Sequence, residues 1–349
     1  MRTVQHFQNP WRGRGFPAGG LSPLADVSDV AELLSKCPAH TPTQLRDAPE
    51  LAVALGVARI SLKDERQRMG LGSFKALGAA HAIAREAAVV GAGDLLQALQ
   101  GRVYVTASAG NHGLSVAAGA RLFGARAVIY LSDAVPEAFA ERLREKGADV
   151  VRAGADYEAS MRTAADAAQA RGWTLLSDSS WPDYTELPLR VMEGYLQLAA
   201  EAVAQIDTPP SHVLLQAGVG GLAAAVAAHM RHVWGEGPQI IVVEPDAAPA
   251  LMEGIRAGQV VDTTGPASCM GRLDCKAASM IALNGLARDA DAFVTISETD
   301  AQRAADLMAA HGLPTTPSGA AGIAALPAGL DLPADAHVLA IVSEGPEDG

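Results

Sequence analysis

Short β-branched and aliphatic runs alternate along this chain with Ala-rich stretches long enough to form helices, and this alternation restricts the fold more than any other feature. The predicted strands are 58–63, 103–106, 127–131, 213–216, 240–243 and 338–342. The predicted helices are 73–88, 113–123, 137–146 and 222–233. Strands that alternate with helices in this way indicate parallel sheets covered on both faces, so the sequence predicts an α/β fold.

The length of the chain and the direction of its strands predict where the chemistry lies. With 349 residues the chain exceeds what one hydrophobic core usually organises, so we expect two lobes. In parallel sheets ligands bind beyond the carboxyl ends of the strands, in the turns that lead into helices. Three such turns carry candidate functional residues, namely 63–74, 107–113 and 217–222.

One of these turns is rich in glycine, and it consists of Ala217, Gly218, Val219, Gly220, Gly221 and Leu222. Glycines let the backbone approach a ligand closely, and the first turn of a helix presents unpaired N–H groups with a partial positive charge. The turn therefore suits a phosphate group, although a turn that only packs a helix against a strand has the same composition.

A dinucleotide is the alternative ligand for the glycine-rich turn. Gly218, Gly220 and Ala223 fit a dinucleotide fingerprint, and Glu244 ends the next strand, where an acidic residue would bind the ribose. This segment alone does not distinguish a nicotinamide cofactor from another cofactor that carries a phosphate.

Lys75 lies early in a predicted helix, directly after Ser73 and Phe74. The positive end of the helix dipole disfavours the charged form of a lysine, so the position suits an amine that forms a Schiff base. A solvated surface lysine is the plain alternative, and the apolar neighbours Phe74, Ala76 and Leu77 argue against it.

The remaining turn joins a strand to a helix through small and polar residues, which are Ser108, Ala109, Gly110, Asn111, His112 and Gly113. Its N–H groups can bind a carboxylate, and the Asn111 amide can donate a hydrogen bond to a ring oxygen. Taken alone, Asn111 fits a helix cap equally well, and His112 fits a packing residue.

Charge and composition argue against other classes of ligand. A net charge of −12 leaves no broad basic surface for a nucleic acid. Cys37, Cys269 and Cys275 are too few for a disulfide framework or a zinc cluster, and His229 with His232 has no further ligand cluster nearby, so no metal is expected. Residues 1–20 lack the apolar stretch of a signal peptide, and no apolar run reaches the ~18 residues of a membrane span, so we expect a soluble, cytoplasmic protein without membrane contact.

Taken together, the three turns resemble those of the fold type II family of pyridoxal-phosphate enzymes, which includes serine and threonine dehydratases. Ser73-Phe74-Lys75 resembles the family's Schiff-base lysine motif, 108–113 its asparagine loop and 218–222 its phosphate loop. Within the family, the chain is most similar to the diaminopropionate ammonia-lyases over about residues 40–345. The segments that carry this resemblance are 63–66, 70–78, 178–181 with 184–185, 214–220 and 242–246.

The resemblance implies a tryptophan synthase β-like fold, in which each of two lobes holds a mainly parallel sheet flanked by helices. Residues 1–75 and 187–349 would form a large cofactor-binding domain, and residues 76–186 a small domain. A homodimer is the usual assembly in this family.

The resemblance also assigns roles around pyridoxal 5′-phosphate. Lys75 would carry the cofactor aldehyde, Asn111 would lie beside the 3′-oxygen, Gly218 to Leu222 would hold the phosphate, and Ser343 would meet the pyridine nitrogen. A hydroxyl stabilises a pyridinium less well than a carboxylate does, so the ring would be a weaker electron sink. This favours prompt loss of a β-leaving group over a long-lived carbanion.

The chain also departs from the ammonia-lyase pattern. Ala109 stands where that family has an aspartate that removes the α-proton of one substrate enantiomer, whereas Asp178 matches the base for the other enantiomer. We therefore expect use of one stereoisomer, with Asp178 or Lys75 as the base; a loop-capping aspartate is the plain alternative.

A second departure is a charged segment that contains Arg272 and Lys276 and replaces a largely uncharged one. We expect one of these cations to bind a distal carboxylate, as in a 3-hydroxyaspartate-like substrate, and a solvated loop is the alternative. Pro317 replaces a frequent acid, which leaves the exact substrate open.

These features predict α,β-elimination on a small β-substituted amino acid such as 2,3-diaminopropionate, 3-hydroxyaspartate, serine or threonine, giving a 2-oxo acid and ammonia. Ser108, Ala109, Gly110 and His112 are expected to bind the substrate. Lys75 needs a depressed pKa for this chemistry, which burial and the helix N-terminus can supply. The alternatives are a β-replacement synthase, a nicotinamide-dependent oxidoreductase and a non-catalytic protein that binds pyridoxal phosphate or an amino acid.

Overall fold

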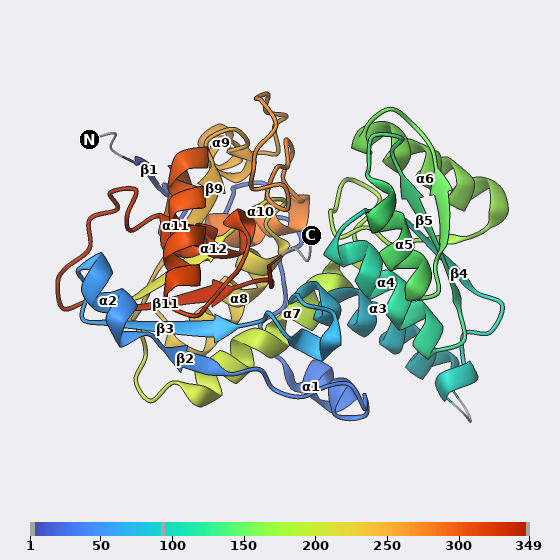
Figure 1. Ribbon diagram of the computed structural model, residues 1–349, viewed down its shortest axis with the longest axis horizontal. Coiled ribbons are helices and arrows are strands. Elements are labelled where there is room, and N and C mark those ends of the chain that lie inside the picture. The colour runs from blue at the N-terminus through green and yellow to red at the C-terminus, as the bar shows by residue number, and fades with distance from the viewer. Residues whose placement is uncertain (1–3, 92–94, 347–349) are drawn as a thin grey trace.

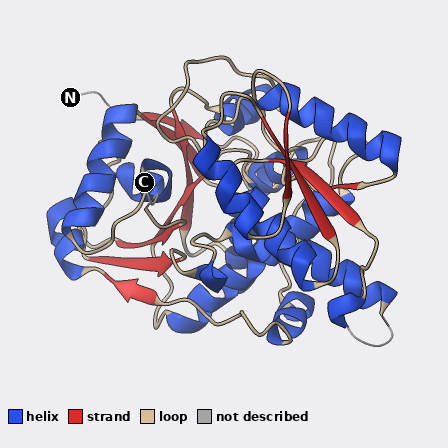
Figure 2. Cartoon of the chain, turned by 45° about the vertical axis from the view of Figure 1, so that its right-hand side comes forward, coloured by secondary structure: helices blue, strands red, loops and turns tan. Residues whose placement is uncertain are grey.

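The computed structural model of the chain describes residues 4–91 and 95–346. Within them, the strands form a seven-stranded and a four-stranded sheet, which lie side by side (Figures 1 and 2). The seven-stranded sheet has the order β1-β10-β9-β8-β11-β3-β2. Its strands are β1 Gln5–Gln8, β2 Leu45–Asp47, β3 Arg59–Asp64, β8 His212–Gln216, β9 Gln239–Pro245, β10 Ala292–Ile296 and β11 His337–Val342. The edge strands β1 and β2 are antiparallel to their neighbours, and the strands between them are parallel.

The four-stranded sheet is parallel throughout and has the order β6-β5-β4-β7. Its strands are β4 Val103–Ala107, β5 Arg126–Leu131, β6 Asp149–Arg152 and β7 Thr174–Leu175. In Figure 1 this sheet lies on the right with α4, α5 and α6, while the larger sheet lies on the left. The predicted α/β fold with mainly parallel sheets is confirmed, whereas the division into domains 1–75 with 187–349 and 76–186 stays a prediction.

Helices surround both sheets (Figure 2). They are α1 Ser28–Ser35, α2 Pro49–Leu55, α3 Lys75–Val90, α4 Asn111–Leu122, α5 Glu137–Glu145, α6 Tyr157–Arg171, α7 Glu186–Gln205, α8 Gly221–Trp234, α9 Ala250–Ala257, α10 Met280–Asp289, α11 Glu298–Ala310 and α12 Pro317–Ala324, with short 3₁₀ turns η1 Arg68–Gly70 and η2 Leu95–Gln97. Among the helices of the described residues, none combines the length and apolarity that a membrane crossing requires.

Strand β8 is apolar over Val213 to Leu215 because it is buried on both faces of the sheet. Val213 and Leu215 belong to the core on the face covered by α7, α8 and α10, whereas Leu214 belongs to a second core beneath α11 and α12. Successive side chains of a strand point to opposite faces, so a strand covered on both faces has no polar side. The first of these cores continues through α3 and α4 to the small sheet, where it includes Tyr104 and Ile129.

Candidate active site

Three segments with predicted site residues leave the seven-stranded sheet at the same edge. Strands β8, β11 and β3 are neighbours and run parallel, so their carboxyl ends lie together. The glycine-rich turn 217–222 follows β8, Ser343 follows β11, and the segment that leads to Lys75 follows β3. The Phe74 N–H donates a hydrogen bond to the Ser343 carbonyl at 3.1 Å, which joins two of these segments directly.

Buried charges anchor the turn between β3 and α3. The Arg68 guanidinium, which is fully buried, donates to the carboxylates of Glu65 and Glu201 at 2.7 Å each. The buried Lys63 ammonium donates to Glu201 at 2.8 Å. Burial alone raises the pKa of Glu201, but the hydrogen bonds from Arg68 and the attraction to both cations lower it to about 2. The charges are balanced and tie this turn to α7, which carries Glu201.

Lys75 opens α3, and its ammonium donates a hydrogen bond to the Asp178 carboxylate. Burial lowers the pKa of Lys75, but attraction to Asp178 outweighs burial and raises the pKa above its ordinary value. The depressed pKa expected from the sequence is therefore absent while this pair is intact. For Asp178, burial raises the pKa and attraction to Lys75 lowers it below its ordinary value, so both groups of the pair are charged.

The loop around Asp178 is fixed from both sides. The Tyr184 hydroxyl accepts a hydrogen bond from the Ser177 N–H at 3.0 Å and donates one to the Leu175 carbonyl at 2.8 Å. Ser180 hydrogen-bonds through its hydroxyl to the Ser279 hydroxyl at 2.7 Å, just before α10. Asp178 is therefore held toward Lys75 by a loop that joins the small sheet to the rest of the molecule.

The glycine-rich turn has the properties of a phosphate site. Gly220 has a φ of 97°, and a Cβ built on it would lie 3.0 Å from Leu251. A Cβ on Gly218 would lie 3.0 Å from the Cys275 sulfur and 3.0 Å from the Leu273 Cα, so both positions leave little room for a side chain, and the backbone of Gly220 favours glycine. The N–H groups of Gly220, Gly221 and Leu222 are buried and donate no hydrogen bond to any described residue. Unpaired donors at the start of α8 are the partners that an anion needs.

The asparagine loop offers a second set of unpaired donors. Helix α4 begins at Asn111, and the N–H groups of Asn111, His112 and Gly113 donate to no described residue. Ser108 accepts a hydrogen bond from the Gly110 N–H at 3.3 Å, so Ser108 shapes the loop. Ala109 contributes only a methyl group beside these donors.

His112 links the asparagine loop to the strand that precedes Asp178. Its Nε2 lies 2.9 Å from the Leu176 carbonyl, which can only accept, so this nitrogen carries the proton. Burial lowers the pKa of His112, which keeps the imidazole neutral. The His112 side chain therefore holds the asparagine loop to Leu176, and its backbone N–H donates to no described residue; its substrate-binding role stays a prediction.

Glu344 lies at the opposite wall of the site and was not identified from the sequence. Its carboxylate accepts hydrogen bonds from the Asn111 amide and from the Thr316 hydroxyl. Arg272 Nε lies 3.6 Å from the same carboxylate. A Cβ on Gly110 would lie 3.0 Å from an Arg272 guanidinium nitrogen, so this guanidinium lies against the asparagine loop. Glu344 lies two residues after the predicted last strand, at the carboxyl end where ligands bind, but nothing in the local sequence marks its contacts with Asn111 and Thr316.

Lys276 does not join this group. Its ammonium donates to the carbonyls of Ala247 and Pro266 at 2.9 and 3.0 Å and to the Asp274 carboxylate at 2.6 Å. These oxygens occupy the donors that a substrate carboxylate would need. Of the two cations predicted to bind substrate, the structure places only Arg272 beside the asparagine loop.

Two further residues near Lys75 were missed because nothing in their local sequence marks them. The Lys75 ammonium lies 5.7 Å from the centre of the Tyr195 ring, whose buried hydroxyl makes no hydrogen bond to any described residue. Burial raises the pKa of this hydroxyl and that of the Cys275 thiol to about 12, so both are neutral. Ser343 is buried, and its backbone carbonyl accepts the hydrogen bond from Phe74 described above.

The dinucleotide alternative finds no support in Glu244. Its side chain is fully buried and accepts hydrogen bonds from the N–H groups of Leu251 and Met252 at the start of α9. It therefore caps a helix and presents no oxygen to a ribose.

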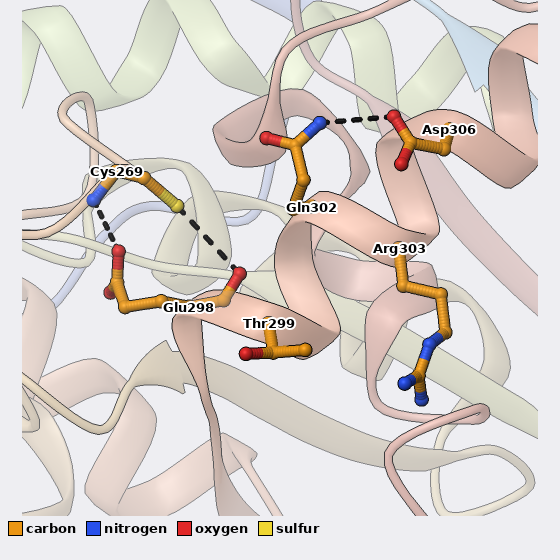
Figure 3. A pocket seen from close by; sticks show the side chains of 6 residues that line it. All are labelled: Cys269, Glu298, Thr299, Gln302, Arg303 and Asp306. Atoms are coloured by element: carbon orange, nitrogen blue, oxygen red, sulfur yellow. Dashed lines mark hydrogen bonds between the residues drawn. The ribbon is translucent and has the colours of Figure 1, made fainter.

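A surface hollow lies apart from the residues described above (Figure 3). Its lining consists of Cys269, Glu298, Thr299, Gln302, Arg303 and Asp306. None of these is a predicted site residue. Among residues 4–91 and 95–346, there is also no group of three or more His, Cys, Asp or Glu side chains placed to hold a metal ion.

Comparison with known proteins gives consistent matches. Residues 37–344 match the family model described as pyridoxal-phosphate dependent enzyme. Diaminopropionate ammonia-lyase of Salmonella typhimurium is 32% identical over 99% of this chain and 96% of its own length. Human serine dehydratase-like protein is 30% identical over 69% of each chain.

A solved structure of the Escherichia coli diaminopropionate ammonia-lyase, described as a complex with an aminoacrylate-PLP azomethine reaction intermediate, superposes with a TM-score of 0.87. It is 29% identical, and the match covers 99% of this chain and 94% of that one. Maize serine racemase, at 20% identity and a TM-score of 0.78, shares the fold.

Proposed function

Because the chain belongs to the family of pyridoxal-phosphate dependent enzymes, we propose that it is a lyase that eliminates the β-substituent of a small amino acid. The Lys75–Asp178 pair carries this proposal, since it sets an amine and a candidate base side by side. The site fits the cofactor, because closely packed glycines and buried N–H groups without a partner among the described residues form a phosphate site at the same sheet edge as Lys75.

The residues that would hold the cofactor come from four segments. Lys75 would supply the amine for the aldehyde, Gly218 to Leu222 would supply phosphate donors, and Ser343 would offer its hydroxyl to the pyridine nitrogen. Asn111 would lie beside the ring oxygen. When bound, pyridoxal phosphate supplies the electron sink that makes the α-proton of the substrate acidic.

The α-proton requires a base, and Asp178 is the residue we assign to this role. Its pKa is low because Lys75 is charged, whereas burial acts in the opposite direction. If the amine of Lys75 is engaged elsewhere, burial favours a carboxylate that takes up a proton. Lys75 itself is the alternative base. Ala109 has no acidic group, which supports the expectation that one stereoisomer is used.

The substrate would be oriented through its carboxylates. The unpaired N–H groups of Asn111, His112 and Gly113 suit the α-carboxylate. Arg272 lies against Gly110 in the same loop and suits a second carboxylate on the β-carbon, as in 3-hydroxyaspartate. Diaminopropionate, serine and threonine lack that group and would use the loop alone.

The reaction balances for both leaving groups: a β-amino substrate takes up one water and releases two molecules of ammonia, whereas a β-hydroxy substrate takes up no net water and releases one. A proton leaves the α-carbon, the β-amine or β-hydroxyl departs with its bonding electrons and takes up a proton, and hydrolysis of the released enamine gives a 2-oxo acid and ammonia. In a β-replacement synthase, a second nucleophile would add at the β-carbon in place of the departed group. A non-catalytic protein would bind the cofactor or the amino acid without removing the α-proton.

One set of measurements separates these possibilities. The purified protein should show a visible cofactor band that borohydride abolishes, with the reduced label on Lys75 by peptide mapping. Lys75→Ala should lose the label, and Lys276→Ala should keep it. Ammonia and a 2-oxo acid should form without added thiol, from one enantiomer only. A protein that pyridoxal phosphate cannot reconstitute would refute the proposal.

The assembly and location are also proposed. We propose a homodimer in the cytoplasm, supported by the usual assembly of fold type II enzymes and by the free state of Cys37, Cys269 and Cys275. Light scattering coupled to gel filtration should give twice the chain mass of 35.9 kDa. A monomeric mass would contradict the assembly.

A further inference from the structure

Glu344 joins two walls of the site through one carboxylate. It follows β11 of the seven-stranded sheet and is 5% exposed. One carboxylate oxygen accepts the hydrogen bond from the Asn111 amide at the start of α4, and the other accepts from Thr316 at the start of α12. The Glu344 carbonyl accepts a further hydrogen bond from Thr315 at 2.6 Å. The carboxylate therefore has a fixed place.

This contact determines which way the Asn111 amide is turned. The oxygen and nitrogen ends of an asparagine side chain have nearly the same shape, but a carboxylate can only accept. The NH₂ group of Asn111 must therefore face Glu344, and one of its two N–H bonds is used there. The amide's hydrogen bond among the described residues is the one to Glu344, so its other N–H is left for a second acceptor.

We propose that Glu344 is a positioning residue that holds the Asn111 amide with its second N–H directed at the cofactor ring oxygen. The inference rests on the proposed function, which puts Asn111 beside that oxygen. Without Glu344, the amide can turn and present its own oxygen to the ring oxygen, which would replace a hydrogen bond by a repulsion between two acceptors. The Nε of Arg272 lies 3.6 Å from the same carboxylate.

The competing explanation is that Glu344 only connects the start of α4 with the start of α12. The two explanations differ in how the effects of Glu344 and Asn111 substitutions on cofactor binding combine. If Glu344 acts through Asn111, its removal has no further effect once the Asn111 amide is gone. If Glu344 only holds the walls together, the two losses add. Residues in one hydrogen-bond chain are non-additive, and a double-mutant cycle measures this directly.

The experiment is a titration of the cofactor-free full chain with pyridoxal phosphate for Glu344→Gln, Asn111→Ala and the double variant. Each single variant should raise the Kd about tenfold, and the double variant should bind no more weakly than Asn111→Ala alone. The visible band of the bound cofactor, which responds to a donor on the ring oxygen, should shift in the same direction in both single variants. Glu193→Gln is the matched control, because Glu193 is equally buried and pairs with Arg190; its Kd and band should equal those of the wild type.

Each other outcome has a defined meaning. An additive double variant, near a hundredfold, would overturn the role of Glu344 and leave the proposed function standing. An Asn111→Ala variant with wild-type Kd and band would remove Asn111 from the cofactor site and the inference with it, and the borohydride label on Lys75 would then show whether the proposed function also fails. Should Glu344→Gln not fold, Glu344→Asp keeps the charge and withdraws the carboxylate, and it should show the same coupling to Asn111→Ala.

Discussion

Replacing Arg272 with alanine should raise the KM for 3-hydroxyaspartate about tenfold and leave the KM for serine nearly unchanged. The guanidinium lies against Gly110, beside the N–H groups proposed to hold the α-carboxylate. A hydrogen bond to a charged group contributes about 1.5–3 kcal/mol to stability or binding. The Arg272 side chain is 29% exposed and is already near Glu344, so we expect the lower end of this range, and about 1.4 kcal/mol corresponds to tenfold.

The assay is steady-state release of 2-oxo acid from both substrates by the cofactor-saturated enzyme. Lys276→Ala is the control from the same loop, because its ammonium is held by Ala247, Pro266 and Asp274, and it should not change the ratio of the two KM values. An equal rise for serine would mean that Arg272 meets the α-carboxylate, and an unchanged KM for 3-hydroxyaspartate would exclude the proposed contact.

Three further changes have defined results. Asp178→Asn should lower kcat by about 10²–10⁴ with little change in cofactor binding, whereas Asp183→Asn on the same loop should be neutral; equal activities would exclude Asp178 as the base. Glu201→Gln leaves the buried Arg68 without its second carboxylate, so the free energy of unfolding in urea should fall by about 3–5 kcal/mol, and a loss below about 1 kcal/mol would contradict the charge balance described here. Burial raises the pKa of Glu244 from 4.5 to about 8, so its contribution to stability is complete below pH 4.5 and is lost as the pH rises through 8. Glu244→Gln should flatten the decline in unfolding free energy across this range, and identical slopes for variant and wild type would show that Glu244 does not titrate there.

The central fold could be predicted because its signals are local. Strands β8 and β11 are continuous apolar runs, and their two-sided burial explains why no alternation is visible. The edge strand β1 is the segment Gln5–Gln8, whose mostly polar and exposed residues give no strand signal. Helix α7 was missed although it has 20 residues, because Pro188 and Gly194 suggest interruptions. Pro188 lies in the first turn, where a missing N–H is tolerated, and a Cβ on Gly194 would lie 2.4 Å from the Leu77 carbonyl, so this glycine permits close packing on α3.

Site residues could be predicted where a reactive side chain or a run of glycines lies in a strand-to-helix turn. Lys75 and the glycine-rich turn are recognisable within a few residues, and the structure places both at one sheet edge. Asp178 carries no local signal, and only the family resemblance pointed to it. Tyr195 and Glu344 reach the site from elements far along the chain, so their roles depend on tertiary packing that no local pattern encodes.

The charged pairs of the site affect which substrates it favours, those with one carboxylate or those with two. Lys75 faces Asp178 on one side, and Arg272 Nε lies 3.6 Å from the Glu344 carboxylate on the other. A substrate with one carboxylate can be bound by the backbone donors of the asparagine loop without disturbing the contact between Arg272 and Glu344. A second carboxylate must instead share Arg272 with Glu344, and two anions around one cation are acceptable only if Glu344 keeps its hydrogen bonds to Asn111 and Thr316. Weakening these bonds should therefore penalise a dicarboxylic substrate more than serine, which links substrate choice to the residue that orients Asn111.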